Sequence, residues 1–168
     1  MEVRNILMNM NSEKRREELN MLHDRMSIPI QGNDMNRTMN QWEIQQLTKF
    51  NNISIGAHTK SHTKLSQLSV DSQKEEINES KEILEKISGQ KIKIFSYPFG
   101  EDEDYTEQTV EILKTCGIKK AAVVKQGLYS KEYGEYRIPR NTVNGGTTVR
   151  QLKKIIEKSW FEYGEKAI

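Results

Sequence analysis

The sequence predicts an α/β fold, a partial (β/α) barrel in which about half of the usual strands are present. Short apolar runs alternate with longer segments in which apolar residues recur every three or four positions, and these patterns are typical of strands and of amphipathic helices. Strands that alternate with helices form right-handed βαβ units and a parallel sheet. We expect strands at 53–55, 91–97 and 121–124 and a weaker one at 136–138, whereas a closed barrel of the common kind has about eight.

The chain is expected to divide into an amino-terminal helical segment with a loop, residues 1–37, and a partial barrel domain, residues 38–168. Apolar residues at helical spacing predict a helix from Glu13 to Met26. Proline and glycine without any apolar period indicate a loop at 27–37.

A second helix is predicted to begin at Asn40, which can cap it while Glu43 reaches back to form a capping box. Met39 and Ile44 occupy the two positions of a hydrophobic staple. Trp42 lies off the apolar stripe of this helix, and we expect it to pack against a neighbouring element, with stacking on a sugar as the alternative.

Three further helices follow from local start and stop signals. Ser69 opens the longest one and Gly89 ends it. Asp104 and the glutamate three residues later predict the start of the next, which Gly117 ends. The last helix is predicted to begin near Thr147, with Val149, Leu152, Ile156 and Trp160 on its buried face.

Composition excludes several classes of function. The charged residues make up 30% of the chain but leave a net charge of only +2, and no basic stripe with interleaved aromatic residues indicates nucleic acid as a partner. A single cysteine, Cys116, excludes an internal disulfide. The sequence has no apolar run long enough to span a membrane and no signal peptide, so the default compartment is the cytoplasm.

The segment 53–65 carries the strongest functional signal. His58 and His62 are four residues apart after a short apolar run and a glycine, and one turn of helix would bring two such side chains within about 5 to 6 Å of each other. Neutral imidazole is a common zinc ligand, and a catalytic zinc site has three protein ligands. Two are visible here, and the alternative is a pair of solvated loop residues.

The string His58-Thr59-Lys60-Ser61-His62 resembles the second motif of the polysaccharide deacetylases, the NodB-homology family of carbohydrate esterases, which reads His-Ser/Thr-x-x-His. The string Tyr97-Pro98-Phe99-Gly100 is similar to the third motif, Arg-x-Pro-Tyr/Phe, with Ser96 in place of the arginine. The resemblance covers roughly residues 38–140.

The resemblance implies metal-dependent hydrolysis of acetyl groups, N-acetyl more than O-acetyl, from a polysaccharide or oligosaccharide. His58 and His62 would bind zinc or another divalent metal, and Tyr97, Pro98 and Phe99 would line the substrate groove. The Phe99 N–H would also bind the oxyanion. Arg140 is the candidate to replace the missing arginine by orienting an aspartate, and its alternative role is a surface charge.

Two features of the family pattern, which between them fill three roles, are absent from this sequence. There is no Asp-Asp pair to supply the general base and the third metal ligand, and no histidine after His62 to protonate the leaving group. Either the aspartates lie upstream in a longer product, or the protein is a relative that binds polysaccharide without catalysing its hydrolysis. A structural interaction domain is the third alternative. Because half a barrel has open strand edges, we also expect a homo-oligomer.

Overall fold

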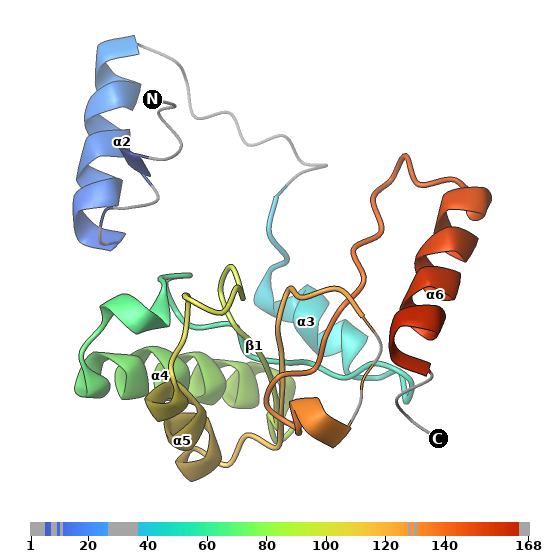
Figure 1. Cartoon of the computed structure of the whole chain (residues 1–168). Coiled ribbons are helices and arrows are strands. Elements are labelled where there is room, and N and C mark those ends of the chain that lie inside the picture. The colour runs from blue at the N-terminus through green and yellow to red at the C-terminus, as the bar shows by residue number, and fades with distance from the viewer. Residues whose placement is uncertain are drawn as a thin grey trace. The chain divides into compact units, whose positions relative to one another are not determined.

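The computed structural model describes residues 6–7, 10, 12–26, 37–127, 129 and 131–164. The chain divides into two compact units, Met1–Gln46 and Leu47–Ile168, which are described separately (Figure 1). The predicted division at 37/38 stays a prediction. No helix within the described ranges is long and apolar enough to cross a membrane.

The first unit contains helix α2 (Ser12–Met26), which confirms the helix predicted over the same stretch. Its predicted apolar stripe is largely exposed within this unit, with Met26 at 61%. The predicted loop at 27–37 lies outside the described residues except for Arg37.

Helix α3 (Gln41–Leu47) begins as predicted. The Glu43 N–H donates to Asn40 Oδ1 at 2.9 Å, and the Asn40 N–H donates to Glu43 Oε2 at 2.8 Å, so the capping box is confirmed. The expectation that Trp42 packs against a neighbour is wrong, because its side chain is 65% exposed. Met39 is also more than half exposed. Helix α3 has no buried residue, so we attribute its stability more to the capping hydrogen bonds than to packing.

The second unit holds the sheet and the remaining helices (Figure 1). Its elements in chain order are η2 (Leu65–Gln67), α4 (Val70–Ser88), β1 (Ile94–Ser96), α5 (Glu107–Thr115), β2 (Lys120–Ala122), η3 (Lys131–Tyr133) and α6 (Val149–Gly164).

The sheet of the described residues has two strands, β1 and β2, which pair in parallel with Phe95 opposite Ala121. Two isolated parallel bridges extend it, from Ala57 to Phe95 on one side and from Ala122 to Ile138 on the other. The order of parallel segments is therefore that of successive βα units, and the predicted class, a partial α/β barrel, is confirmed.

The predicted strand at 53–55 is wrong in position, because pairing occurs at Ala57 instead. The Ala57 N–H donates to the Ile94 carbonyl and the Ser96 N–H donates to the Ala57 carbonyl, both at 2.9 Å. Gly56 permits this approach, since a Cβ there would lie 3.2 Å from the Ile94 carbonyl oxygen. The weaker strand predicted at 136–138 does not form as a strand. Only an isolated bridge, from Ile138 to Ala122, is present there.

The core forms around β1 and is covered by α4 and α5, which lie side by side (Figure 1). Phe95, Ile77 and Leu113 are each at most 1% exposed, and burial of each such side chain contributes about 1.5–3 kcal/mol. Ser69 caps α4 by accepting from the Ser72 N–H, and Gly89 ends the helix with φ 69°, as predicted.

Helix α5 begins at a different cap from the one predicted. Thr106 is the cap, and it forms a reciprocal capping box with Thr109. Asp104 lies two residues too early for this role and is buried instead, at 1% exposure. The end of the helix is as predicted, since Gly117 has φ 79° and the Ile118 N–H donates to the Leu113 carbonyl.

Helix α6 begins two residues after the predicted start, with Thr148 and Gln151 exchanging hydrogen bonds at its first turn. The predicted buried face is wrong for Val149 and Ile156, which are 72% and 53% exposed. The side chain of Trp160 lies outside the described part of the chain.

Candidate functional site

The histidine segment is an irregular loop that follows the Ala57 bridge and is not helical. The prediction that a helical turn aligns the two imidazoles is therefore wrong. Thr59 has φ 62° and His62 has φ 55°, both in the left-handed region. The His62 N–H donates to Thr59 Oγ1 at 3.1 Å, which closes the loop locally. The left-handed conformations of Thr59 and His62 bend this segment, and this bend replaces the helical turn.

The two imidazoles are nevertheless adjacent. Their ring centroids are 4.7 Å apart in an edge-to-face arrangement. His58 Nδ1 lies 2.7 Å from the Ser96 carbonyl oxygen at the end of β1. A carbonyl only accepts, so Nδ1 carries a proton, and in the neutral ring Nε2 then keeps its lone pair. Orientation of one ring nitrogen by a backbone carbonyl is the usual arrangement of a metal-ligating histidine.

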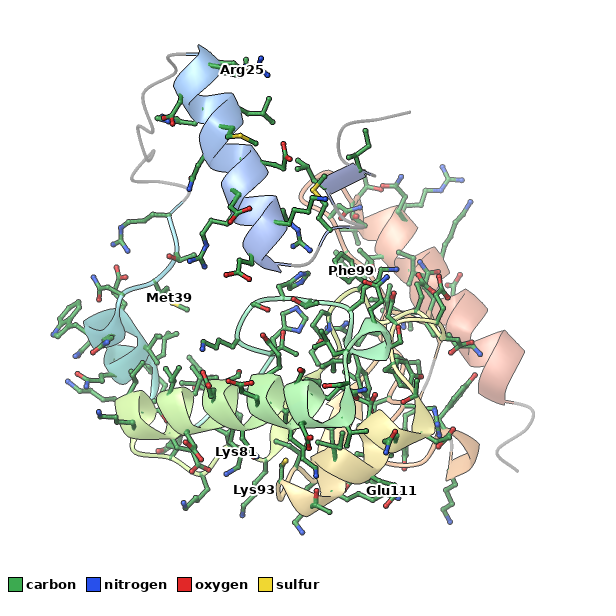
Figure 2. The ribbon with its side chains drawn as sticks, turned by 90° about the vertical axis from the view of Figure 1, so that its left-hand side faces the viewer. Arg25, Met39, Lys81, Lys93, Phe99 and Glu111 are labelled. Carbon is green, nitrogen blue, oxygen red and sulfur yellow. The ribbon has the colours of Figure 1, made fainter. Side chains whose placement is uncertain are left out.

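The loop after β1 brings Phe99 to the same place. Phe99 has φ 62° and is the central residue of a tight turn. The residues on either side of it are joined by a hydrogen bond of 2.7 Å from the Gly100 N–H to the Pro98 carbonyl. The Phe99 ring contacts the His62 ring edge-to-face with centroids 4.9 Å apart. Figure 2 shows Phe99 at the opposite end of this unit from Lys93, which precedes β1. Phe99 thus lies at the carboxyl end of the strand, where α/β barrels place functional groups.

The amide of Phe99 is available as a donor, since no hydrogen bond from it is found among the described residues. Gly100 is required next to it, because φ is 80° and a Cβ would lie 3.0 Å from the Val124 backbone nitrogen. The backbone of this turn is therefore closely constrained by the segment after β2.

Tyr97 and Pro98, which the sequence proposes as substrate-binding residues, have buried side chains. The Tyr97 hydroxyl donates to the Tyr136 carbonyl at 3.0 Å, and its ring stacks on Tyr105. Burial raises the pKa of Tyr97 well above its usual range. Of the three proposed substrate-binding residues, only Phe99 has a partly exposed side chain. The substrate-binding role of the three stays a prediction.

Arg140 lies after the Ile138 bridge. Its Nε donates to the Val123 carbonyl at 2.9 Å, just beyond the end of β2. No carboxylate is paired with its guanidinium in the part of the chain that the structure describes. Its predicted role in orienting an aspartate therefore stays a prediction.

The donor set fits a divalent metal with two ligands, His58 and His62, because their rings are adjacent and His58 presents Nε2. Within the described ranges, no group of three or more histidine, cysteine, aspartate or glutamate side chains lies together. A third protein ligand therefore does not come from these residues as they are arranged here.

Two carboxylates that support the site were missed from the sequence. Glu76 in α4 accepts hydrogen bonds from the loop between the histidines. Asp104 pairs with Lys64 Nζ at 2.7 Å, and the Nζ atom also lies 5.4 Å from the centroid of the Phe99 ring. Neither contact has a local sequence signal, because each joins segments at least 15 residues apart.

A pocket of about 270 Å³ lies away from these residues. It is lined by Asp102, Tyr105, Thr106, Glu107 and Arg137. Arg137 forms an ion pair with Glu107 and so does not present a free charge to the pocket. None of the proposed site residues lines this pocket, and it does not compete with the histidine pair as the candidate site.

The fold and the site together define an α/β protein with paired histidines near the carboxyl ends of parallel strands. The chain belongs to the polysaccharide deacetylase family, whose family model matches residues 30–121. It is 30% identical over 105 residues to YxkH of Bacillus subtilis, provisionally named a polysaccharide deacetylase, an alignment that covers 62% of this chain and 37% of YxkH.

Solved structures show the same fold. The deacetylase PplD of Streptococcus pyogenes, solved in complex with acetate, superposes with a TM-score of 0.64 at 22% identity, covering 73% of this chain and 52% of that one. A polysaccharide deacetylase of Bacillus cereus superposes with a TM-score of 0.63 at 26% identity, covering 73% and 38%. The chain thus spans about half or less of the length of these relatives.

Proposed function

We propose that the chain is part of a metal-dependent deacetylase that hydrolyses acetyl groups, N-acetyl more than O-acetyl, from a polysaccharide or oligosaccharide. Membership of the family supports deacetylation as the reaction class. The observation that carries the proposal is the pair of imidazoles 4.7 Å apart, with His58 Nδ1 donating to the Ser96 carbonyl.

His58 and His62 would hold zinc or another divalent metal, which when bound polarises the acetyl carbonyl and activates water for attack. Holding the metal requires both imidazoles to be neutral. In the neutral His58 ring, the Ser96 carbonyl selects the tautomer that carries its proton on Nδ1, which leaves Nε2 to bind the metal.

The backbone amide of Phe99 would donate a hydrogen bond to the acetyl oxygen as negative charge develops on it. Its position beside His62 and its lack of an acceptor support this role. Loss of a single such donor typically lowers kcat by about 10²–10³-fold. Pro98 restricts the backbone before this amide, and the hydrogen bond from the Gly100 N–H to the Pro98 carbonyl holds the turn after it. The donor is therefore held in place before substrate binds.

The residues needed to move protons are not supplied by this sequence, which contains no Asp-Asp pair and no histidine after His62. A general base and a general acid contribute about 10² to 10⁴-fold each. We therefore propose that these 168 residues alone bind metal weakly and release negligible acetate, and that catalysis needs groups from elsewhere.

A second candidate is a polysaccharide-binding module without activity. It is favoured by the same incomplete ligand set, since no third ligand lies near the histidines among the described residues. Saturable binding of acetylated glucosamine oligomers that does not require metal would support this candidate over the first.

The test is zinc binding by the whole chain and by the variant His58→Ala/His62→Ala, measured with a chromophoric competitor. We expect binding in the wild type that weakens as the pH falls through about 6.5, and no binding in the variant. Zinc binding that survives the double substitution would remove the histidines from the site. Robust metal-dependent acetate release by the wild-type chain would contradict the proposed need for further groups.

We also propose that the chain self-associates. The support is the open sheet, in which the segments at Ala57 and Ile138 have strand partners on one side only within the described residues. Open strand edges favour pairing with another chain.

A further inference from the structure

Glu76 contacts the loop between the two histidines more extensively than any other side chain in the described residues. Its Oε2 atom accepts from the backbone N–H groups of Lys60 and Ser61, each at 2.9 Å. Its Oε1 atom accepts from the Ser61 hydroxyl at 2.6 Å. One carboxylate therefore receives two backbone donors and one side-chain donor from two consecutive loop residues.

The conformation of the loop depends on such an acceptor. Thr59 and His62 are both left-handed, which is unfavourable for residues with a Cβ unless the surroundings hold them there. Successive N–H groups between them point the same way and form a concave site for an anion. The carboxylate of Glu76 occupies that site, and hydrogen bonds to a charged acceptor are about twice as strong as neutral ones.

Helix α4 gives Glu76 a rigid base. The neighbouring Ile77 is fully buried in the core. Gln73, one turn earlier, is buried and accepts from the Thr109 hydroxyl of α5 at 2.7 Å. One turn after Glu76, Glu79 forms an ion pair with Lys60. The loop is thus bound at two successive turns of a helix that is itself fixed to the core.

We infer that Glu76 is a positioning residue that holds His58 and His62 in their metal-binding arrangement. This inference rests on the proposed function. Glu76 acts through the loop and not as a ligand: its two oxygens accept hydrogen bonds from the loop residues Lys60 and Ser61. It also does not lie in a group of three ligating side chains with the histidines among the described residues.

The first arm of the test measures zinc affinity by competition in the whole chain. Glu76→Gln keeps the size of the side chain but leaves one acceptor oxygen for three donors, so zinc affinity should fall by about 10- to 100-fold, as for other residues that orient metal ligands. The matched control is Glu82→Gln, an exposed residue of the same helix, which should bind zinc as the wild type does. Ser61→Ala removes one of the three hydrogen bonds and should give a smaller loss.

Circular dichroism and urea unfolding accompany each variant, so that affinity is compared between folded proteins. If Glu76→Gln does not fold, Ser61→Ala decides the question by the same comparison with Glu82→Gln. Zinc affinity of a folded Glu76→Gln within about twofold of the control would overturn the inference.

The second arm needs no metal. In ¹⁵N-labelled metal-free protein, the amide signals of Lys60 and Ser61 should lie downfield, as expected for N–H groups bound to a carboxylate, and should move upfield in Glu76→Gln but not in Glu82→Gln. The Nδ1-protonated form of His58 should lose population in Glu76→Gln as well. Signals that are the same in both variants would overturn the inference even if zinc binds.

Adding zinc to the wild type separates positioning from ligation. The two amide signals should stay downfield when zinc is bound, whereas an upfield shift would show that Glu76 has left the loop for the metal and would overturn the inference. A wild-type chain that shows the metal-free differences but binds no zinc would contradict the proposed function and leave the effect of Glu76 on the histidines demonstrated.

Discussion

The ion pair between Lys64 and Asp104 offers the sharpest test of how the two loops of the site are joined. Asp104 is 1% exposed and Lys64 retains 22% exposure, with 2.7 Å between Nζ and Oδ1. The other carboxylate oxygen, Oδ2, accepts from the Glu101 N–H at 2.9 Å. Lys64 follows the histidine loop and Glu101 follows the Phe99 turn, so this carboxylate links both.

Replacing Lys64 with methionine should destabilise the fold by about 3 kcal/mol. Removal of one partner from a buried ion pair costs about 3–5 kcal/mol, because the remaining charge stays buried without compensation. We expect the lower end of this range of free energies because Lys64 is partly exposed, so water can reach the position of the lost ammonium group. Within the described residues, Oδ1 of Asp104 has no hydrogen-bonding partner that could take over.

The assay is urea unfolding of the wild type, Lys64→Met, Asp104→Asn and the double variant. Asp104→Asn should cost about 1–3 kcal/mol, and the double variant should be less destabilised than the sum by at least about 1 kcal/mol, since the two side chains interact directly. The control is Lys93→Met, at an exposed position, with an expected change within about 0.5 kcal/mol. A cost below about 1 kcal/mol for Lys64→Met, or additive single effects, would refute the reasoning.

Three further predictions concern the scaffold. Asn40→Ala removes the cap of α3 and should lower the free energy of unfolding by about 1 kcal/mol without changing zinc affinity; a melting temperature equal to that of the wild type would contradict this. Glu85 accepts from the Ile92 N–H, which lowers its pKa from 4.5 to about 2. Its contribution to stability is therefore complete above pH 4.5 and lost as the pH falls toward 2. Urea unfolding between pH 4.5 and 2 should show that Glu85→Gln loses less free energy of unfolding than the wild type as the pH falls. Equal losses in the two proteins would contradict the role given to Glu85. Light scattering should detect a dimer or larger species, and a monomer at millimolar concentration would exclude self-association.

The start and stop signals of helices were readable from the sequence because they are local. The box formed by Asn40 and Glu43 spans three residues and depends only on short side chains and adjacent N–H groups. The left-handed glycines at 89 and 117 end their helices in the same local way. The predicted cap of α5 at Asp104 is wrong because aspartate and threonine are both good caps, and the local sequence does not distinguish them. Thr106 caps the helix, and Asp104 pairs with Lys64 instead.

The strands were predicted less well, since a strand exists only through its partner. The run at 53–55 has the alternating pattern, yet the hydrogen bonds to β1 begin at Ala57. The pattern indicates which residues are suited to a sheet, whereas register depends on where Gly56 allows close approach to the Ile94 carbonyl. The pairing with β1 therefore occurs at Ala57, the residue before His58, and not at 53–55.

The histidine pair illustrates how the spacing of a motif can suggest the wrong local geometry. Spacing by four residues suggests a helical turn, but the rings are brought together by left-handed residues at Thr59 and His62. That conformation depends on acceptors that the motif does not contain: the Ser96 carbonyl for His58 and the Glu76 carboxylate for the intervening loop. A string of five residues therefore identifies the two candidate side chains, while contacts with the strand and the helix that follow it determine how those side chains lie.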